Sequence, residues 1–189
     1  MQKRQNPETT KQRIMDAAEQ IVVSRGAGKL TFDELVLETG VSKGGILYHY
    51  PSKSILLASM VKRMLTGFGH GRRRAGDALG YDSDTLDSDG MAKAKTYILA
   101  SFDHQERERN RSTALIAAAA NDPELLGVVR EHFKANFDEI RQMGNKSMLA
   151  MILFLAADGL WLLDALQLSP LTKDERLGLK EMMLKLADA

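Results

Sequence analysis

Apolar residues recur along the chain at the three- and four-residue spacing of α-helices, and no segment alternates as a β-strand would. The first stripe of apolar residues predicts a helix of about four turns that ends near residues 25–26; it consists of Ile14, Ala17, Ala18, Ile21 and Val22. Residues 69–90 are rich in glycine and aspartate, which predicts a helix end and a mobile loop. We therefore expect an all-α fold of about nine helices. Further predicted helices cover about 52–68, 91–108, 111–120, 123–140, 147–168 and 172 onward.

Residues 31–53 predict two short helices joined by a tight turn. Thr31 and Glu34 have the spacing of a capping box, which satisfies free amides at the start of the first helix. Gly40 can end that helix in the left-handed conformation, because glycine has no Cβ to clash. Ser42 can then cap the second helix.

The second helix, over roughly 42–49, mixes polar residues and two glycines with a predicted buried pair, Ile46 and Leu47. Tyr50 should be extended, because the ring of Pro51 clashes with a helical predecessor. This order fits a helix-turn-helix whose second helix enters a DNA major groove.

The motif resembles the DNA-binding head of the TetR/AcrR family of bacterial transcriptional regulators. The similarity covers about residues 10–65 and is sharpest over 41–53, VSKGGILYHYPSK. Many members have Leu in place of Ile46 and Phe in place of Tyr50. Many others have Thr at the position of Gly45 and Tyr at that of Leu47. These departures change which bases the helix can recognise, but they do not change its identity as a DNA-recognition helix.

The resemblance implies a DNA-binding domain over residues 1–51 and an effector-binding and dimerisation domain over residues 52–189. It also implies a homodimeric repressor, released from a palindromic operator by a small molecule that shifts the spacing of the two heads. Two-fold pairing predicts pseudo-palindromic half-sites about 34–36 Å apart, or a multiple of that.

Contacts to DNA divide into phosphate positioning and base reading. Lys43 and His49 are the expected base readers, since lysine donates to guanine O6 and N7. Gly44 and Gly45 either let the helix backbone approach DNA closely or serve only the turn. By the family pattern, phosphate contacts are expected from Thr31, Ser42, Tyr48, Tyr50 and Lys53. Lys3 and Arg4 form a basic arm that could reach a minor groove.

The net charge of +1 over 189 residues conceals an asymmetry. Residues 1–76 carry 13 Lys/Arg against 6 Asp/Glu, a net +7, while residues 77–189 carry 13 against 19, a net −6. A basic head suits phosphate binding, although chance clustering on solvated faces gives the same count. The chain lacks cysteine and its first residues lack the apolar core of a signal peptide, so we expect a cytoplasmic protein.

No catalytic or metal-binding constellation stands out. The four histidines are scattered without ligand spacing, and no nucleophile turn or phosphate loop occurs. The aspartates at 82, 84, 87 and 89 do not match an EF-hand, because Thr85 and Thr96 fall at its first and last ligand positions. We expect no cofactor, no metal and no enzymatic activity. His132 either lines a cavity beside the predicted Phe133/Phe137 stripe or is an ordinary hydrogen-bonded or solvent-facing histidine.

Residues 148–168 are apolar enough to span a bilayer, but Asp158 and Asp164 would be costly there. A helix that is apolar nearly all round is otherwise buried on two sides. The family resemblance places it in a four-helix bundle across a two-fold axis. The expected interface residues are Leu149, Leu153, Ala156, Ala157, Leu160 and Leu163; the alternative for each is ordinary intrachain core.

The resemblance also implies an effector pocket in the body. Asp158 could bind a cationic or hydroxyl-bearing ligand, cap a neighbouring helix or pair across the dimer. The candidate lining residues are large and adaptable, and the alternative for each is core packing. They are Met64, Phe68, Tyr97, Phe102, Phe133, Phe137, Met151, Phe154, Asp158 and Trp161.

Three functions stay open on sequence alone. The first is a homodimeric, ligand-responsive repressor. The second is a DNA-binding protein that works without an effector, and the third is an all-α enzyme that carries an incidental helix-turn-helix.

Overall fold

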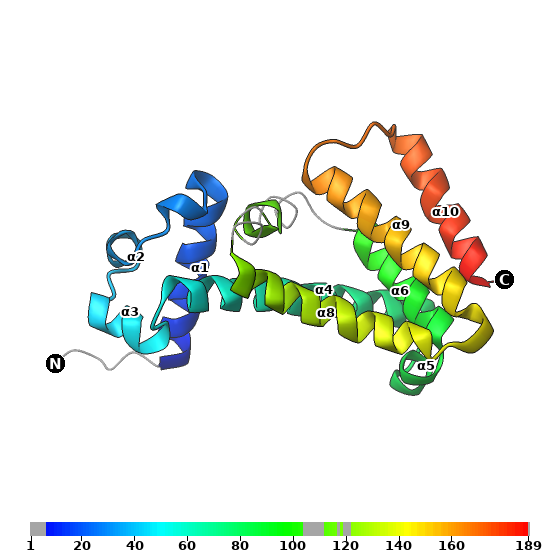
Figure 1. The fold of residues 1–189 in the computed structure, drawn as a ribbon, viewed down its shortest axis with the longest axis horizontal. Helices are drawn as coiled ribbons and strands as arrows, with labels where there is room; N and C mark the ends of the chain where they lie inside the picture. Colours follow the sequence, from blue (N-terminus) through cyan, green and yellow to red (C-terminus); the bar gives the residue numbers. More distant parts are fainter. Residues whose placement is uncertain (1–6, 104–111, 117, 119–121, 189) are drawn as a thin grey trace. The chain divides into compact units, whose positions relative to one another are not determined.

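The computed structural model describes residues 7–103, 112–116, 118 and 122–188, and these residues form helices and connecting turns without a strand. Residues 112–116 are also helical. Figure 1 labels the helices, and the all-α prediction is confirmed. They are α1 (Pro7–Arg25), η1 (Ala27–Lys29), α2 (Phe32–Thr39), α3 (Lys43–His49), α4 (Lys53–Leu79), α5 (Ser83–Ser88), α6 (Gly90–Phe102), α8 (Pro123–Arg141), η2 (Gly144–Lys146), α9 (Ser147–Ala165) and α10 (Lys173–Asp188).

The chain packs as two compact units. The described part of the first comprises residues 7–64 together with 112–116, 118 and 122–129, and that of the second comprises 65–103 and 130–188. Residues 53–64 of α4 thus belong to the first unit. The predicted boundary between functional domains after residue 51 remains a prediction.

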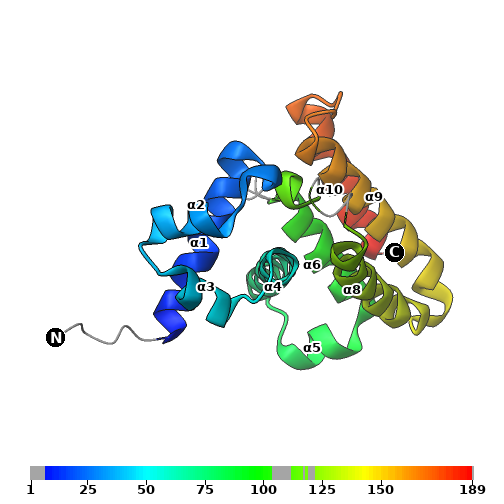
Figure 2. The same ribbon diagram turned by 60° about the vertical axis from the view of Figure 1, so that its left-hand side comes forward.

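In the first unit, α1, α2 and α3 pack on one another, as Figures 1 and 2 show. The predicted stripe of α1 supplies buried Ile14, Ala18 and Ile21. Leu35 of α2 and Ile46 of α3 complete this core, and both are almost fully buried. Helices as short as α2 and α3 are only marginally stable alone, so the burial of one face of each against the core is what stabilises them.

The predicted loop over residues 69–90 is wrong for most of its length, since α4 continues to Leu79 and residues 83–88 form α5. Tertiary packing explains why glycines are tolerated within the helix. A Cβ on Gly71 would lie 3.6 Å from the Cβ of Ala100, and one on Gly76 would lie 3.0 Å from Leu86. Gly76 therefore lets α4 approach α5 closely, whereas the distance at Gly71 is an ordinary van der Waals contact that alanine would also allow.

The aspartates after α4 act as helix caps. Asp82 accepts a hydrogen bond from the Thr85 amide (2.8 Å) at the start of α5. Asp89 accepts from the Met91 amide (2.8 Å) at the start of α6. Side-chain oxygens at these positions satisfy amides that have no partner within the helix. Among the described residues, no group of three or more His, Asp or Glu side chains is placed to hold a metal ion.

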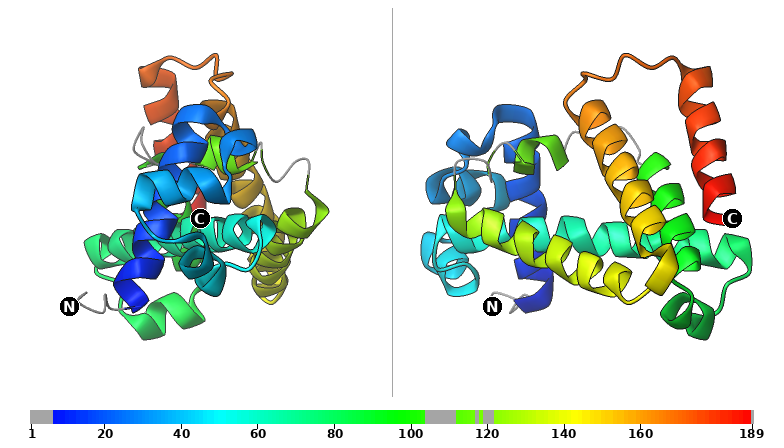
Figure 3. Two further views of the ribbon diagram at one scale, coloured as in Figure 1. Left: turned by 90° about the vertical axis from the view of Figure 1, so that its left-hand side faces the viewer. Right: turned by 45° about the vertical axis from the view of Figure 1, so that its right-hand side comes forward.

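The core of the second unit lies between α6, α9 and α10. Figure 3 (right) shows α9, in orange and yellow, beside green α6, with red α10 following the loop after α9. The predicted capping box opens α10: Glu175 accepts from the Thr172 amide (2.8 Å), and Thr172 accepts from the Glu175 amide (3.2 Å). The core residues are Met91, Ala94, Tyr97, Ile98, Ile140, Ala150, Leu153, Phe154, Ala157, Met183 and Ala187.

Candidate nucleic-acid interface and body cavity

The turn between α2 and α3 has the predicted geometry. Thr31 is extended and its hydroxyl accepts a hydrogen bond from the Glu34 amide (3.1 Å). Gly40 ends α2 in the left-handed conformation, with φ 66°. Ser42 accepts from the Gly45 amide (3.2 Å) and so caps α3. One half of the capping box differs, because the Glu34 carboxylate pairs with Arg25 of α1.

One face of α3 is open to solvent. Lys43, Gly44, Leu47 and Tyr48 are all exposed, and Tyr48 is 81% exposed. Their i, i+1, i+4, i+5 spacing places them along one side of the helix. The predicted burial of Leu47 is therefore wrong, and this residue joins the candidate surface. The half-buried ring of His49 stands edge-on to that of Tyr48, at a centroid distance of 5.1 Å.

Tyr50 does not belong to this surface. Its side chain is only 1% exposed, and its hydroxyl lies 3.5 Å from the carbonyl oxygen of Lys11. This burial contradicts the expected phosphate contact from Tyr50. The residue stands four positions after buried Ile46, so its ring continues the core-facing side of α3.

The predicted lysines have partners within the chain. Lys43 pairs with Asp33 of α2 at 2.9 Å, and both side chains are exposed (56% and 79%). Such exposed pairs contribute little stability, so Lys43 is free to exchange Asp33 for another acceptor. Lys53 donates to the carbonyl oxygen of Ala27 (2.7 Å). An ammonium group has three donors, so this bond leaves Lys53 with capacity for a phosphate.

The two glycines of α3 have different surroundings. A Cβ on Gly44 would meet no atom of the chain within 4 Å, whereas one on Gly45 would lie 2.9 Å from Val41 Cγ1. Gly45 is thus explained by packing in the turn. Gly44 has no such internal reason and stays a candidate for close approach of a partner. Thr31 and Ser42 are exposed beside this face. The predicted arm at Lys3 and Arg4 lies outside the described residues.

The second unit contains a cavity of about 520 Å³. Among the ten predicted pocket residues, Phe154 lines this cavity. Asn136 also lines it and lies 3.2 Å from His132, which is itself absent from the lining. The lining residues are Arg72, Ser88, Asp89, Gly90, Met91, Lys93, Asn136, Glu139, Ile140, Gln142, Met143, Lys146 and Phe154.

Three predicted pocket residues form an aromatic cluster. The ring of Tyr97 lies 5.0 Å from that of Phe68 and 4.0 Å from that of Phe154. The Tyr97 hydroxyl donates to Asp158 Oδ1. The other carboxylate oxygen, Oδ2, is buried without a hydrogen-bond partner in the described part of the chain. Burial raises the pKa of Asp158 to about 6, partly offset by the Tyr97 hydrogen bond. Burial also raises the pKa of Tyr97.

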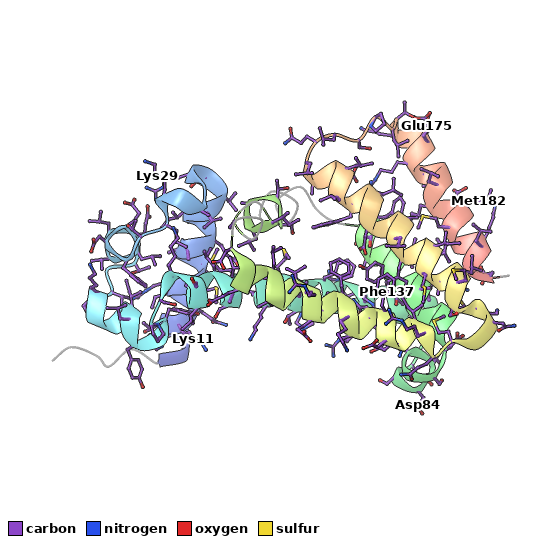
Figure 4. All side chains as sticks on the ribbon, viewed as in Figure 1. Lys11, Lys29, Asp84, Phe137, Glu175 and Met182 are labelled. Carbon is purple, nitrogen blue, oxygen red and sulfur yellow. The ribbon has the colours of Figure 1, made fainter. Side chains whose placement is uncertain are left out.

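The other predicted pocket residues are placed differently. Phe102 is covered by Arg176, whose guanidinium carbon lies 4.8 Å from the ring centroid. Met151 packs against the core, and Phe133 is 39% exposed. Phe137 (labelled in Figure 4) and Trp161 are partly buried. Met64 belongs to the first unit, unlike the rest of the set.

Some of the predicted interface residues on α9 lie on the side of the helix that faces the core of its own chain. Leu153 and Ala157 are 1% and 0% exposed and belong to the core of their own chain. Leu149 and Leu160 pack against that core. Ala156 and Leu163 do lie on the exposed side. That side continues through Met148, Ile152, Leu155, Gly159, Leu162 and Leu166.

The exposed side of α9 makes the helix unusual for a core element. Residues Gly144–Ala165 are long and apolar enough to cross a membrane by length and composition, with a mean hydropathy of 1.8. Only 28% of the most apolar stretch is buried within the chain. Within the helix, Asp164 pairs with Arg176 of α10, and Asp158 accepts from Tyr97.

Two family descriptions match the chain. Residues 14–60 match "Bacterial regulatory proteins, tetR family", and residues 92–188, more than half of the chain, match "Tetracyclin repressor-like, C-terminal domain". The HTH-type transcriptional regulator SrpR of Pseudomonas putida is 33% identical over 54 residues. That match spans 29% of this chain and 25% of SrpR.

Solved structures share the whole fold at low identity. Salmonella enterica GusR is 16% identical, with a TM-score of 0.63 over 98% of this chain and 99% of its own. The multidrug binding protein EbrR complexed with imidazole is 19% identical, with a TM-score of 0.68 over 93% of both chains. Together with the two family matches, these findings show that the chain belongs to the TetR family and is a DNA-binding transcriptional regulator.

Proposed function

We propose that the protein is a homodimeric repressor that binds a pseudo-palindromic operator and leaves it when a small-molecule effector binds the body. The observation that carries DNA binding is the open face of α3, where Lys43, Gly44, Leu47 and Tyr48 are exposed to solvent. Lys43 and His49 read bases in this proposal. Thr31, Ser42, Tyr48 and Lys53 contact phosphates, which position the helix in the groove.

Dimerisation is supported by an apolar face that the described part of the chain leaves exposed. On α9, Met148, Ile152 and Leu155 are 57–66% exposed. On α10, Leu177 and Met182 (labelled in Figure 4) are 55% and 54% exposed. An uncovered face of this kind marks an interaction surface. A second copy is the occupant we propose. The two carboxylates of α9 have partners inside the chain, an arrangement that suits a bundle better than a lipid environment.

An effector is supported by the cavity of about 520 Å³ in the second unit, which lies in the usual range for small-molecule sites. Related folds carry ligands: solved structures of EbrR hold imidazole, ethidium and malachite green. We extend only the general idea of a small organic effector to this chain. The rival proposal, DNA binding without an effector, would leave the cavity without a role.

Family membership makes the protein a transcription factor and not an enzyme. A cytoplasmic location follows from that role and is part of the proposal.

A reporter assay tests the repressor: a promoter that carries a fragment bound by the protein should be silenced by the wild type. Tyr48→Ala should restore expression, because it removes the most exposed large side chain of α3. Increased expression with the wild type would identify an activator and contradict the proposal.

A further inference from the structure

The charged side chains of the cavity are unequally satisfied. Lys93 pairs with Glu139 at 3.2 Å. The Asp89 carboxylate accepts hydrogen bonds from the amides of Met91 (2.8 Å) and Ala92 (3.3 Å). Glu139 thus has a cationic partner, and Asp89 is held by backbone amides, so each carboxylate of the lining already has an interaction within the chain.

Two cations of the lining lack such partners. Within the described residues, the side chains of Arg72 and Lys146 make no ion pair or hydrogen bond. Arg72 is partly buried, and its guanidinium carbon lies 5.6 Å from the ring centroid of Tyr97. Burial lowers the pKa of Arg72, partly offset by electrostatic interactions with Tyr97 and Glu139. A guanidinium nevertheless stays charged and has five N–H donors, so leaving it unpaired away from bulk water is costly.

The rest of the lining is apolar and adaptable. Met91, Ile140 and Phe154 contribute buried side chains. Met143 lies directly against the backbone of Gly90, where any Cβ would collide with it. A flexible thioether at this position can rearrange around ligands of different shape. The lining holds three cations, Arg72, Lys93 and Lys146, against two carboxylates, Asp89 and Glu139, so an excess positive charge lies beside an apolar wall.

We infer that the effector is an amphipathic organic anion, whose acidic group binds Arg72 and Lys146 and whose apolar body packs against Met91, Ile140, Met143 and Phe154. The inference rests on the proposed effector function and names its ligand class. Arg72 can bind a carboxylate or a phosphate through two parallel hydrogen bonds. An organic cation would instead add a further positive charge to a lining that already has more cations than carboxylates.

Calorimetry on the free protein, without DNA, tests the ligand class. The probes share one ten-carbon chain and differ in their head group: decanoate, decyl phosphate, decanol and decylammonium. The inference predicts that an anion binds most tightly, and the tighter of decanoate and decyl phosphate identifies the acidic group. Tighter binding of decylammonium, or no binding of either anion, would overturn it.

Variants of α4 locate the charge. Arg72→Gln should weaken binding of the preferred anion by roughly tenfold to a hundredfold and leave decanol unchanged. Arg73→Gln is the matched control, since Arg73 is exposed on the same helix and does not line the cavity. Equal losses in both variants, or an equal loss for decanol, would overturn the assignment. Arg72→Lys retains the charge but loses the paired donors, so it should weaken anion binding less than Arg72→Gln does and still leave decanol unchanged. It provides the test if Arg72→Gln does not fold, and an unchanged anion affinity together with a weaker decanol affinity would overturn the assignment.

The proposed function is tested separately by operator binding without ligand. If DNA binding is intact and no anion binds, the ligand inference alone fails. If anions bind but the protein has no operator, the repressor proposal fails and the ligand site stands.

Discussion

Replacement of Leu155 by glutamate tests the proposed dimer most sharply. Leu155 is 59% exposed at the middle of α9 and lies on the apolar side that we assign to a second copy. Because it is exposed in the single chain, Leu155→Glu leaves the intrachain core intact. The change should therefore act on association rather than on the helical fold of the subunit.

The magnitude follows from the area that the dimer would cover. Full burial of a leucine stabilises by about 1.5–3 kcal/mol, so covering the exposed 59% contributes about 1–2 kcal/mol per subunit. A two-fold interface contains the residue twice, which makes the loss about 2–4 kcal/mol per dimer. At roughly 1.4 kcal/mol per factor of ten, the dimer Kd should rise about thirtyfold to almost a thousandfold. The buried carboxylate adds to this loss.

Sedimentation equilibrium measures the dimer Kd directly. Leu37→Glu is the matched control, because Leu37 is 79% exposed on α2 and lies outside the proposed interface. We expect the control to sediment as the wild type and Leu155→Glu to shift to monomer, with its far-UV circular dichroism still helical. An unchanged Kd for Leu155→Glu, or a monomeric wild type, would refute the interface.

Three further predictions concern the fold and the DNA surface. Burial raises the pKa of Asp158 from 3.8 to about 6, so its stabilising contribution is complete below pH 3.8 and is lost as the pH rises through 6. Asp158→Asn should thus raise the free energy of unfolding by roughly 2–3 kcal/mol at pH 8 and by much less at pH 5, and a gain independent of pH in urea unfolding would contradict this. Gly44→Ala should stabilise the head by about 0.5–1 kcal/mol yet weaken operator binding. Gly45→Ala should gain less stability, because its Cβ would meet a neighbouring side chain at 2.9 Å. Unchanged operator affinity for Gly44→Ala would contradict its proposed role in close approach to DNA. Lys43→Ala should relax base preference at one position by about 1–3 kcal/mol, and Lys53→Ala should lower the salt slope by about one for all sequences; a sequence-independent loss for Lys43→Ala in competition binding would count against base reading.

The helix-turn-helix was predictable because its rules are local. Thr31, Gly40 and Ser42 each fix the backbone within a few residues through caps or a left-handed turn, and the structure has all three. Tyr50 was harder, because tyrosine suits both a phosphate contact and a core. Its spacing of four from Ile46 was the signal that pointed to burial.

Longer-range packing explains the other errors. Gly76 read as a helix breaker, but within α4 it makes room for the side chain of Leu86 in α5. In α9, apolar residues on every side leave no periodicity with which to separate the core face from the exposed face. Which side of α9 faces the core is seen only in the folded structure, where Leu153 packs among the core residues of its own chain.

Arg72 was missed for a related reason. It belongs to a run of three arginines in a segment that read as a loop, and the structure places it in the lining of the cavity. Its spacing of four from Phe68 on a continuous helix was the available signal, and that signal required α4 to extend past residue 69.

Selection of genomic fragments by the purified protein, at about 50 and 200 mM salt, tests the central claim most directly. The account predicts that a pseudo-palindrome, with half-sites spaced for a two-fold dimer, is recovered at both salt concentrations. Recovery of unrelated sequences that dissociate at the higher salt would indicate only nonspecific phosphate binding and would contradict an operator-specific repressor.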